Sequence, residues 1–549
     1  RDILQVSMNE YWFATESGIF IWKTNTQTFT HLKKRFLDPY SLSDNALYAL
    51  CKDREGGVWA GSYFGGVNYW SAANTFFQKF FPDNTFTSIS GRAVREICED
   101  KNGNIWIGTE DAGISKINPQ TGAIRQFEPD GTKNTISYRN IHGLFIDDSL
   151  LWIGTFEHGI DVMDIRTEKV IKHFSAGPKA TDIKSNFIYC FLRHSRNDLY
   201  MGTTNGVYLF SPRSETFQRP PELAGAHNVR SVIEDHNGVI WAAAFGQGVF
   251  WFNTLTRKSG QVQSMASNTN SLSDNNVNAL FEDSAGNLWF ATEGGGLCKL
   301  DTNRKKFTRY SIRDGLPSDF VFKVIEDNNH YIWITTSKGL VNMNPSTGEM
   351  NVYTKANGLL TDQFNYHSGY KDKNGKLYFG SVNGLIAFQP KRMPSDSSQL
   401  HVYITSIQVQ NKEIPVDPQN GILKKSPIVT DKITLPYFQT SVSFDFSALS
   451  YVAPGTVQYA YMLEGLDKEW TYLNTNRKVY FTNLSPGTYI FRVKATHNHL
   501  WNTPETKMVI HINSPLWATP YAYAFYFLIL GLLSWYLIIT YHNRQKVKR

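Results

Sequence analysis

Cysteine is scarce in this chain, with four residues among 549. Their spacing matches no zinc-binding or redox motif, and it does not suggest a disulfide framework. Cys51 and Cys98 each stand eight residues before a tryptophan, Trp59 and Trp106, so they occupy the same place in two successive units. We therefore expect these cysteines to be small, buried core residues.

A strong excess of one charge sign is missing from most of the chain. The formal net charge is +7, and four positive charges fall in the last six positions, at Arg544, Lys546, Lys548 and Arg549. The rest of the chain carries a net charge of +3 and contains no basic stripe, so no binding to nucleic acid is expected in this segment.

Sequence signatures of catalysis are also lacking. We find no nucleophile elbow with Ser, His and Asp, no phosphate-binding glycine loop and no His/Cys cluster with metal-ligand spacing. The triple glycine that ends at Gly296 has no helical pattern after it and is interpreted as a turn. The sequence therefore predicts no catalytic residue, no metal site and no cofactor.

The composition favours an all-β protein of more than one domain. Hydrophobic residues make up 41% and charged residues 19%, as in folded proteins, and 549 residues exceed one ordinary core. Aromatic residues at 14% and 40 glycines are typical of short strands joined by tight turns. No heptad or long amphipathic helical pattern precedes the C-terminus.

A repeat decides the expected fold. An aromatic residue followed by a small-residue strand recurs nine times, with 41 to 48 residues between successive aromatics. These aromatics are Trp12, Trp59, Trp106, Trp152, Tyr200, Trp241, Trp289, Trp333 and Tyr378. This period is that of a four-stranded propeller blade. We expect the aromatic residues to pack between blades, because no blade buries its apolar faces alone.

Each unit has the same internal order. An apolar strand such as 277–281 is followed by a polar turn such as 282–287, then by the tryptophan strand and a glycine pair. A Glu-Asp pair precedes the turn in several units, at 99–100, 234–235, 282–283 and 326–327. Because this pair recurs in blade after blade, it is expected to cap turns and not to act as paired catalytic carboxylates.

The number of repeats leaves the size of the ring open. Seven units between residues 85 and 395 would close one seven-bladed propeller, and residues 1–84 would then be the last blades of an upstream propeller. A single ring of eight or nine blades is the alternative. The chain starts at Arg1 without a methionine or a signal peptide, and we expect it to be cut from a longer protein.

A β-sandwich is expected after the propeller, over residues 396–514. Residues 391–399 are hydrophilic and are interpreted as a linker. Alternating strands then run from 401 to 512, a length that suits one small Ig-like sandwich. Clear alternation is present in 442–446 and 489–493.

One transmembrane helix is expected near the C-terminus. Residues 515–541 carry no charge, and Tyr521 to Thr540 is long enough to cross about 30 Å of hydrocarbon. Trp517, Tyr521 and Tyr541 are placed as interface anchors. The basic stub 542–549 predicts a cytoplasmic C-terminus, with the β domains outside the inner membrane.

These motifs resemble a known family. The Trp-Ile-Gly-Thr strands, the glycine pairs and the loop 271–275 are similar to the regulator-propeller repeats of Bacteroides-type hybrid two-component sensors. The segment 459–470, with Tyr489, Phe491 and Trp501, resembles the three-tyrosine (Y_Y_Y) sandwich of those sensors. The resemblance implies two tandem seven-bladed propellers with a junction near 63–69, a periplasmic location, a homodimer and a cytoplasmic histidine kinase outside this sequence. Many members detect glycan fragments.

Candidate ligand-binding residues are expected at one mouth of the ring. Loops joining outer to inner strands, and second to third strands, converge there, and in this sequence they break the repeat consensus with aromatic and polar residues. These residues are Arg139, Phe156, His158, Arg230, Phe245, Gln247, Tyr366 and His367. Such side chains suit an oligosaccharide or another small ligand.

The sequence thus supports the hypothesis of a ligand-sensing receptor segment that signals through its membrane helix. A membrane-anchored propeller enzyme, such as a lyase or a glycosidase, is the main alternative, and it requires acidic residues that converge at the mouth. A purely structural or adhesive propeller is a third possibility. The membrane helix followed by a basic stub favours the receptor.

Overall fold

The computed structural model describes residues 1–71, 75–83, 85, 87–195, 197–392, 400–451, 454, 457–473, 476–496, 501 and 503–547. Two compact units, Arg1–Ser395 and Asp396–Arg549, are each described by themselves. Most of the expected linker, at 393–399, and the basic residues Lys548 and Arg549 lie outside the described residues.

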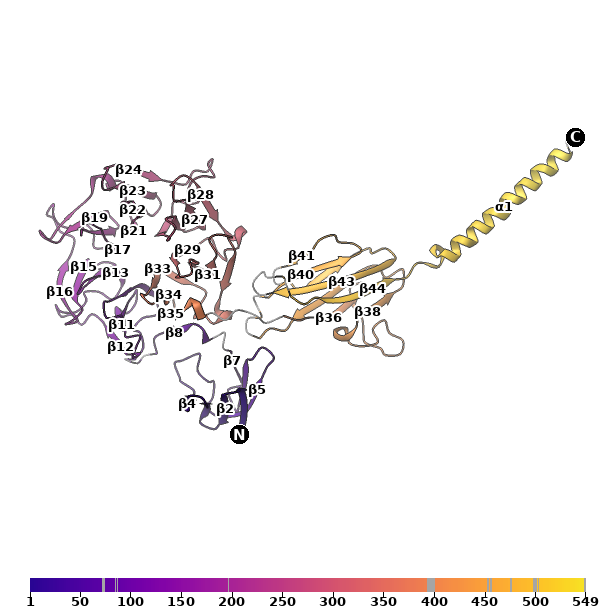
Figure 1. The fold of residues 1–549 in the computed structure, drawn as a ribbon, viewed down its shortest axis with the longest axis horizontal. Helices are drawn as coiled ribbons and strands as arrows, with labels where there is room; N and C mark the ends of the chain where they lie inside the picture. The colour runs from indigo at the N-terminus through magenta and orange to yellow at the C-terminus, as the bar shows by residue number, and fades with distance from the viewer. Residues whose placement is uncertain are drawn as a thin grey trace. The chain divides into compact units, whose positions relative to one another are not determined.

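The first unit contains a ring of seven four-stranded antiparallel sheets (Figure 1). Six sheets follow chain order: β9 (Val94–Glu99), β10 (Ile105–Thr109), β11 (Ile114–Ile117), β12 (Ile124–Phe127); β13 (Ile141–Asp147), β14 (Leu150–Thr155), β15 (Ile160–Asp164), β16 (Lys169–Phe174); β17 (Ile188–Arg193), β18 (Leu199–Thr203), β19 (Gly206–Ser211), β20 (Thr216–Gln218); β21 (Val229–Glu234), β22 (Val239–Ala244), β23 (Gly248–Asn253), β24 (Ser259–Val262); β25 (Val277–Glu282), β26 (Leu288–Thr292), β27 (Leu297–Leu300), β28 (Phe307–Tyr310); and β29 (Val321–Glu326), β30 (Ile332–Thr336), β31 (Gly339–Met343), β32 (Met350–Tyr353). The first strand of each sheet contacts the first strand of the next. These first strands therefore surround the ring axis.

The seventh sheet closes the ring, because three of its strands come from the end of the ring sequence and the fourth comes from the beginning. It contains β33 (Phe364–Lys371), β34 (Leu377–Ser381), β35 (Gly384–Phe388) and β8 (Gln78–Phe80). Strand β8 pairs with β35, where Phe80 lies opposite Leu385, and β33 contacts β9. The seven-bladed fold is therefore confirmed. The expected boundary at residue 84 was wrong, because the outer strand of the last blade comes from Gln78–Phe80.

The tryptophans and the Glu-Asp pairs have structural roles within the blades. Trp289 is fully buried between its own sheet and residues of the next sheet, including Val321 and Ile332. Its indole N–H donates to Asp283 at 2.8 Å, and the other carboxylate oxygen of Asp283 caps the turn. The same indole-to-aspartate bond recurs as Trp106–Asp100, Trp241–Asp235 and Trp333–Asp327. These aspartates are capping residues, as expected.

The glutamate of each pair joins its blade to the preceding one. Glu326 accepts the backbone N–H of Ser284 at 2.7 Å, and Glu282 accepts that of His236 at 2.9 Å. Lys373 in the last blade donates its backbone N–H to Glu99 in the first, at 3.0 Å. Glu234 accepts the backbone N–H of Ser195 in the same way, so wherever the glutamate recurs, including at the closing boundary, it joins two blades by the same bond.

Two further sheets precede the ring. One contains β1 (Asp2–Ser7), β2 (Glu10–Thr15), β3 (Gly18–Lys23) and β4 (Thr28–Leu32), and the other contains β5 (Leu47–Lys52), β6 (Val58–Ser62) and β7 (Val67–Trp70). They share a core that includes Trp12 and Leu47. Cys51 on β5 is exposed, contrary to the expected burial. Cys98, the equivalent residue in the ring, is buried.

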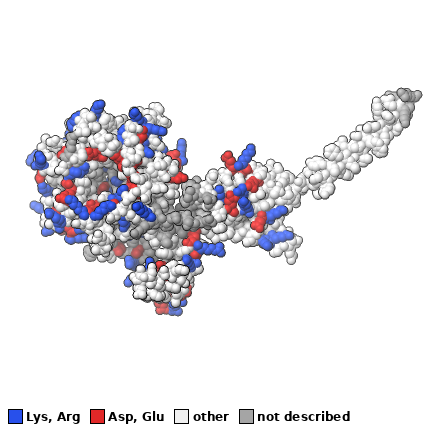
Figure 2. Space-filling model, in the orientation of Figure 1, with Lys and Arg blue, Asp and Glu red and all other residues white. Residues whose placement is uncertain are grey.

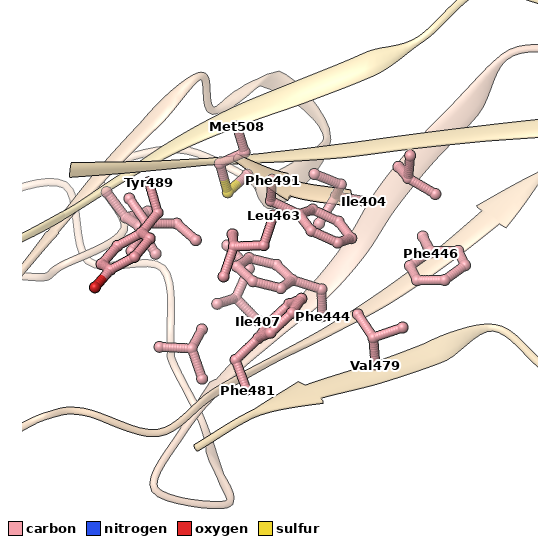
Figure 3. Close-up of a cluster of buried hydrophobic side chains, with 14 of the residues drawn as sticks. Ile404, Ile407, Phe444, Phe446, Leu463, Val479, Phe481, Tyr489, Phe491 and Met508 are labelled. Atoms are coloured by element: carbon pink, nitrogen blue, oxygen red, sulfur yellow. The ribbon is translucent and has the colours of Figure 1, made fainter. Parts of the chain in front are cut away.

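The second unit begins with a sandwich of two sheets. One sheet contains β36 (Val402–Val409), β37 (Lys412–Glu413), β39 (Val442–Ala448) and β42 (Lys478–Phe481). The other contains β38 (Lys432–Leu435), β40 (Gln458–Glu464), β41 (Thr471–Leu473), β43 (Gly487–Thr496) and β44 (Thr506–Ile512). Side chains of both sheets meet in one core, where Phe444 stacks on Phe491 at 4.4 Å (Figure 3).

The tyrosines of the sandwich are core and corner residues. Tyr459 is fully buried and its hydroxyl accepts the backbone N–H of Ala448 at 3.1 Å. The hydroxyl of Tyr489 donates to the backbone oxygen of Ser485 at 3.0 Å, the arrangement of a tyrosine corner. These contacts account for both residues without a ligand.

Helix α1 (Pro520–Val547) follows the sandwich. Its residues Pro520–Gln545 form a 26-residue candidate membrane span with apolar side chains exposed all round. At 1.5 Å per residue this span is about 39 Å long, enough to cross the hydrocarbon core. Short 3-10 turns complete the described elements: η2 (Pro221–Leu223), η3 (Ile312–Asp314), η4 (Lys355–Asn357), η5 (Pro390–Arg392), η6 (Pro427–Val429) and η8 (Leu516–Ala518).

Candidate ligand-binding site

A β-bulge near the start of each inner strand provides the residues at the ring axis. In β21, Val229 pairs with Ala244 and Ser231 with Ala243, so Arg230 between them is left out of the pairing. The equivalent unpaired positions are Arg95, His142, Tyr189, Asn278 and Phe322. We call these six, with Tyr366 of the last blade, the axial residues. A bulge commonly re-aims a side chain in this way.

The last blade has a larger bulge than the others. Phe364 pairs with Ser381 and the next pair is Gly369 with Phe379, so residues 365–368 are all left out of the ladder. Within this bulge His367 adopts a left-handed backbone with φ of 57°. Tyr366 is one of the four residues that this bulge leaves out of the pairing.

A second set of residues lies next to the axial residues. The residue after each second strand donates its backbone N–H to the residue just before the inner strand: Phe245 to Asn228 at 3.1 Å and Glu293 to Asn276 at 2.8 Å. We call the equivalent positions Glu110, Phe156, Phe245 and Glu293 the rim residues. This bond places rim and axial residues of one blade side by side.

Arg230 contacts both axial and rim residues, and we call these residues together the Arg230 group. Its guanidinium carbon lies 3.4 Å from the ring centroid of Phe245, a cation–π contact within the same blade. Nη1 donates to Oδ1 of Asn278 at 2.7 Å and lies 3.4 Å from a carboxylate oxygen of Glu293. Burial lowers the pKa of Arg230, and the Glu293 carboxylate opposes that shift.

Tyr366 reaches across the ring axis. Its hydroxyl lies 3.2 Å from Oε1 of Glu293, and its ring centroid lies 4.7 Å from that of Phe322. The guanidinium groups of Arg95 and Arg230, from the first and fourth blades of the ring, each lie 5.6 Å from the Tyr366 ring. Arg95 also binds the rim residue Glu110 at 2.5 Å. Tyr366 thus connects side chains from five blades, counting its own.

Buried polar groups lie close to Tyr366. His142 and His367 are both buried, and burial together with nearby cations lowers the pKa of each, to about 2 for His142. Arg95 Nε, His142 Nδ1 and His367 Nε2 are buried atoms that make no hydrogen bond to any described residue. Hydroxyl groups of a ligand or water can satisfy atoms of this kind.

Glu96 and Lys323 are oppositely charged, partly buried residues of two inner strands. Burial raises the pKa of Glu96 and lowers the pKa of Lys323, and the attraction between the two opposite charges counters both shifts. Each of these residues follows an axial residue in its strand.

The structure brings four of the eight sequence-predicted residues to the group around Tyr366: Arg230, His367, Tyr366 itself and the rim residue Phe245. Phe156 is a rim residue whose ring lies 4.8 Å from that of the axial His142. The remaining three make local contacts. The ring of His158 stacks on Tyr138 at 4.2 Å, the Gln247 side chain bonds the backbone of His227 and Gly225, and Arg139 is exposed.

Sequence reasoning missed several residues of the group, including Arg95, Asn278 and Glu293. A signal for two of them was present: Arg95 and Asn278 are polar residues at the second place of an inner strand, directly after a valine. Glu293 directly follows the Ala-Thr end of the tryptophan strand, the place that Phe245 takes in the preceding blade.

Acidic and basic side chains are mixed on the surface of the ring. Figure 2 shows Lys and Arg interspersed with Asp and Glu over the visible face of the ring, with no patch of one sign. Within the described part of the chain, no group of three or more His, Cys, Asp or Glu residues is placed to hold a metal ion.

Two family descriptions match parts of the chain. "Two component regulator propeller" matches residues 41–64, 88–111 and 271–294, and "Y_Y_Y domain" matches residues 450–513. The first set covers units from both the preceding sheets and the ring, and the second covers most of the later strands of the sandwich.

Solved structures similar to the chain include extracellular domains of two-component systems. The extracellular domain described as hybrid two-component system BT3049 from B. thetaiotaomicron has 27% identity and a TM-score of 0.77, over 93% of this chain and 68% of that one. The extracellular domain of BT4673 from the same organism shares the fold, with 18% identity and a TM-score of 0.50. This match covers 94% of this chain and 69% of that one.

A curated relative extends the comparison to a kinase. Histidine kinase P4 of Formosa agariphila is 26% identical over 460 residues, which make up 73% of this chain and 33% of the relative. The chain therefore spans about a third of that relative's length. The chain thus carries stretches that match the two component regulator propeller and Y_Y_Y descriptions, and it is similar to the extracellular domains of two-component systems and to a histidine kinase.

Proposed function

We propose that the chain binds an oligosaccharide at the axial mouth of the seven-bladed ring and passes the signal through the sandwich and α1. The Arg230 group carries this proposal: a guanidinium stacked on Phe245 and bonded to Asn278 stands beside the hydroxyl of Tyr366. Aromatic faces stack on sugar rings, while amide, guanidinium and hydroxyl groups bond to sugar hydroxyls.

The axial position suits a sensor because it connects several blades. A ligand that contacts Arg230, Tyr366 and Arg95 touches the fourth, seventh and first blades of the ring at once. Binding energy can then favour one arrangement of the blades over another, which is the requirement for a ligand-driven change of state. A ligand held on one loop would lack this connection.

The remaining architecture is proposed from the family resemblance. Residues 1–71 form two blades of a preceding propeller, the ring extends from Gln78 to about residue 392, and the sandwich covers 400–513. Two copies of the protein associate, and ligand binding changes their relative placement. The kinase that reads this change lies outside this sequence.

The orientation in the membrane is part of the same proposal. Helix α1 crosses the inner membrane, the β domains are periplasmic, and the basic residues from Arg544 onward lie in the cytoplasm. An excess of Lys and Arg on the cytoplasmic side of a span supports this direction.

The test is calorimetric titration of the ectodomain, extended upstream to complete its first ring, against a panel of glycan fragments. The same mixtures are analysed for cleavage products. Saturable binding of one fragment class, with the fragment intact, is expected. Release of products would replace this proposal with the membrane-anchored enzyme. Absence of binding across the panel would exclude these glycans and direct the search to other ligands.

A further inference from the structure

The end of the sandwich from which α1 leaves is defined by two parallel strands. Strands β38 and β44 pair in parallel, and their last residues, Leu435 and Ile512, lie opposite each other. The backbone N–H of Asn513 donates to the oxygen of Leu435 at 2.9 Å. The loop after β38 and the segment that leads into α1 therefore emerge from the same end of the sandwich.

Exposed aromatic side chains from these two segments meet there. The ring of Tyr437, two residues after β38, lies 5.2 Å from that of Trp517 and 5.5 Å from that of Phe438. Leu516 is also exposed, and Phe438 exposes 58% of its surface. We call Tyr437, Phe438, Leu516 and Trp517 the aromatic patch.

The patch has no charged neighbour along the chain. No charged residue occurs between Lys432 and Asp445, or from Ile512 to Tyr541. A soluble loop with two adjacent exposed aromatics and no charge is unusual, because exposed apolar clusters commonly mark a contact surface. The amide of Gln410 donates to the backbone oxygen of Phe438 at 3.0 Å, which helps to hold the loop in place.

We propose that the loop at 436–439 lies in the interface of the bilayer that α1 crosses, so that the aromatic patch is a lipid-contacting surface. Helix α1 begins at Pro520, three residues after Trp517. If α1 spans the bilayer, Trp517 lies at the level of the lipid headgroups, and its contact partner Tyr437 lies at nearly the same depth. Tyrosine and tryptophan are the residues enriched at this level.

This contact would give the sandwich a second attachment to the membrane beside the helix itself. A sandwich held at one point can tilt freely about the segment before α1. A sandwich held at two points transmits its own tilt to the helix. The inference rests on α1 as a membrane span, which belongs to the proposed function, and its test separates the two.

The experiment places a single spin label on the full chain in phosphatidylcholine/phosphatidylglycerol nanodiscs, with the exposed Cys51 replaced by serine. The test site is Phe438→Cys. The matched control is Val429→Cys, which is 61% exposed and precedes the other end of β38. Leu530→Cys, within α1, reports whether the helix is in lipid. Each label is exposed to oxygen, which concentrates in lipid, and to a water-soluble nickel complex.

The expected result is a severalfold higher ratio of oxygen to nickel collisions at Phe438 than at Val429, with the highest ratio at Leu530. Equal ratios at Phe438 and Val429, with Leu530 in lipid, would overturn this inference and leave the membrane span intact. An aqueous Leu530 would overturn the span and this inference together. Because Phe438 and Val429 are exposed, both substitutions are compatible with folding, which circular dichroism of each variant checks.

Discussion

Asp283 accepts the indole N–H of Trp289 at 2.8 Å, and its other carboxylate oxygen accepts the backbone N–H groups of Ala285 and Asn287. One carboxylate therefore satisfies the only polar atom of a buried tryptophan and closes the turn that precedes it. The indole-to-aspartate bond recurs at the same spacing of six residues in Trp106–Asp100, Trp241–Asp235 and Trp333–Asp327. This double role of the aspartate accounts for the recurrence of Asp and Trp at that spacing.

Replacing Asp283 by alanine is expected to lower the free energy of unfolding of the ring by about 2–4 kcal/mol. The change leaves the buried indole N–H of Trp289 without a partner and removes a turn cap, and each loss costs about 1–2 kcal/mol or more. Urea unfolding followed by tryptophan fluorescence measures the difference.

Asp301→Ala is the matched control for Asp283. Asp301 lies in the same blade and also caps a turn, accepting the backbone N–H groups of Lys305 and Lys306, but it bonds no tryptophan. Its replacement is expected to cost about 1 kcal/mol. Equal losses in both variants would show that the indole bond adds nothing to the stability of the blade.

Removing β8 is expected to destabilise the ring. Two soluble proteins, spanning residues 75–513 and 85–513, differ by the segment that contains β8 and the buried Phe77, whose ring lies 5.0 Å from that of Phe388. Loss of one buried phenylalanine alone costs about 3–5 kcal/mol. The shorter protein should melt at a lower temperature in calorimetry and aggregate through the open edge of β35. Identical melting curves would mean that the ring closes without β8.

Arg230→Ala is expected to weaken binding of the glycan fragment identified by titration by about 10- to 100-fold, since a hydrogen bond to a charged group contributes about 1.5–3 kcal/mol. Arg257→Ala is the matched control. Arg257 also stacks on a phenylalanine, Phe252, at 5.0 Å, but it lies in the turn between β23 and β24, at the opposite end of the blade. An equal loss of affinity in both variants would move the binding site away from the axis.

The free energy of unfolding of the ring is expected to fall as the pH drops below about 6.5, the pKa of histidine in the unfolded chain. Because burial lowers the pKa of His142 to about 2, the unfolded state binds a proton in this range and the folded state does not. The loss is about 1.4 kcal/mol per pH unit for this residue. His142→Gln should therefore flatten the decline, as measured by urea unfolding at several pH values between 4 and 8.

His173 is the control of opposite sign. The hydrogen bond to Asp161 raises the pKa of His173. Protonated His173 therefore stabilises the folded state below the unfolded pKa of histidine, and this stabilisation is lost as the pH rises through the pKa in the folded state. His173→Gln should make the decline toward acid steeper. A flatter profile in this variant would contradict the assigned direction for His173.

Much of the fold could be predicted because each blade repeats the same sequence pattern. Trp106, Trp289 and Trp333 mark their strands so regularly that the blades follow from spacing alone. The same logic failed for β8, since Gln78–Phe80 has no such mark and its partner β35 lies about 300 residues away in the sequence. A short outer strand is defined by its pairing and not by its own pattern.

The site was only partly predictable for a related reason. Arg230 and Phe245 stand out as departures from the repeat, and both take part in the axial group. His158 and Gln247 depart from the repeat as well, yet His158 contacts Tyr138 and Gln247 contacts His227, and neither partner is an axial residue. A departure from the consensus shows that a position is special but does not show which way its side chain points.

Local patterns of burial and turn residues are enough to predict the all-β class, the blade period, the later sandwich and the apolar helix. Three features become visible only in the folded protein: seven blades close the ring, β8 completes the last blade, and Tyr366 meets Arg95, Arg230 and Glu293 at the axis. These contacts join residues from different blades, and their geometry depends on ring closure and on the bulges that turn one side chain per strand inward.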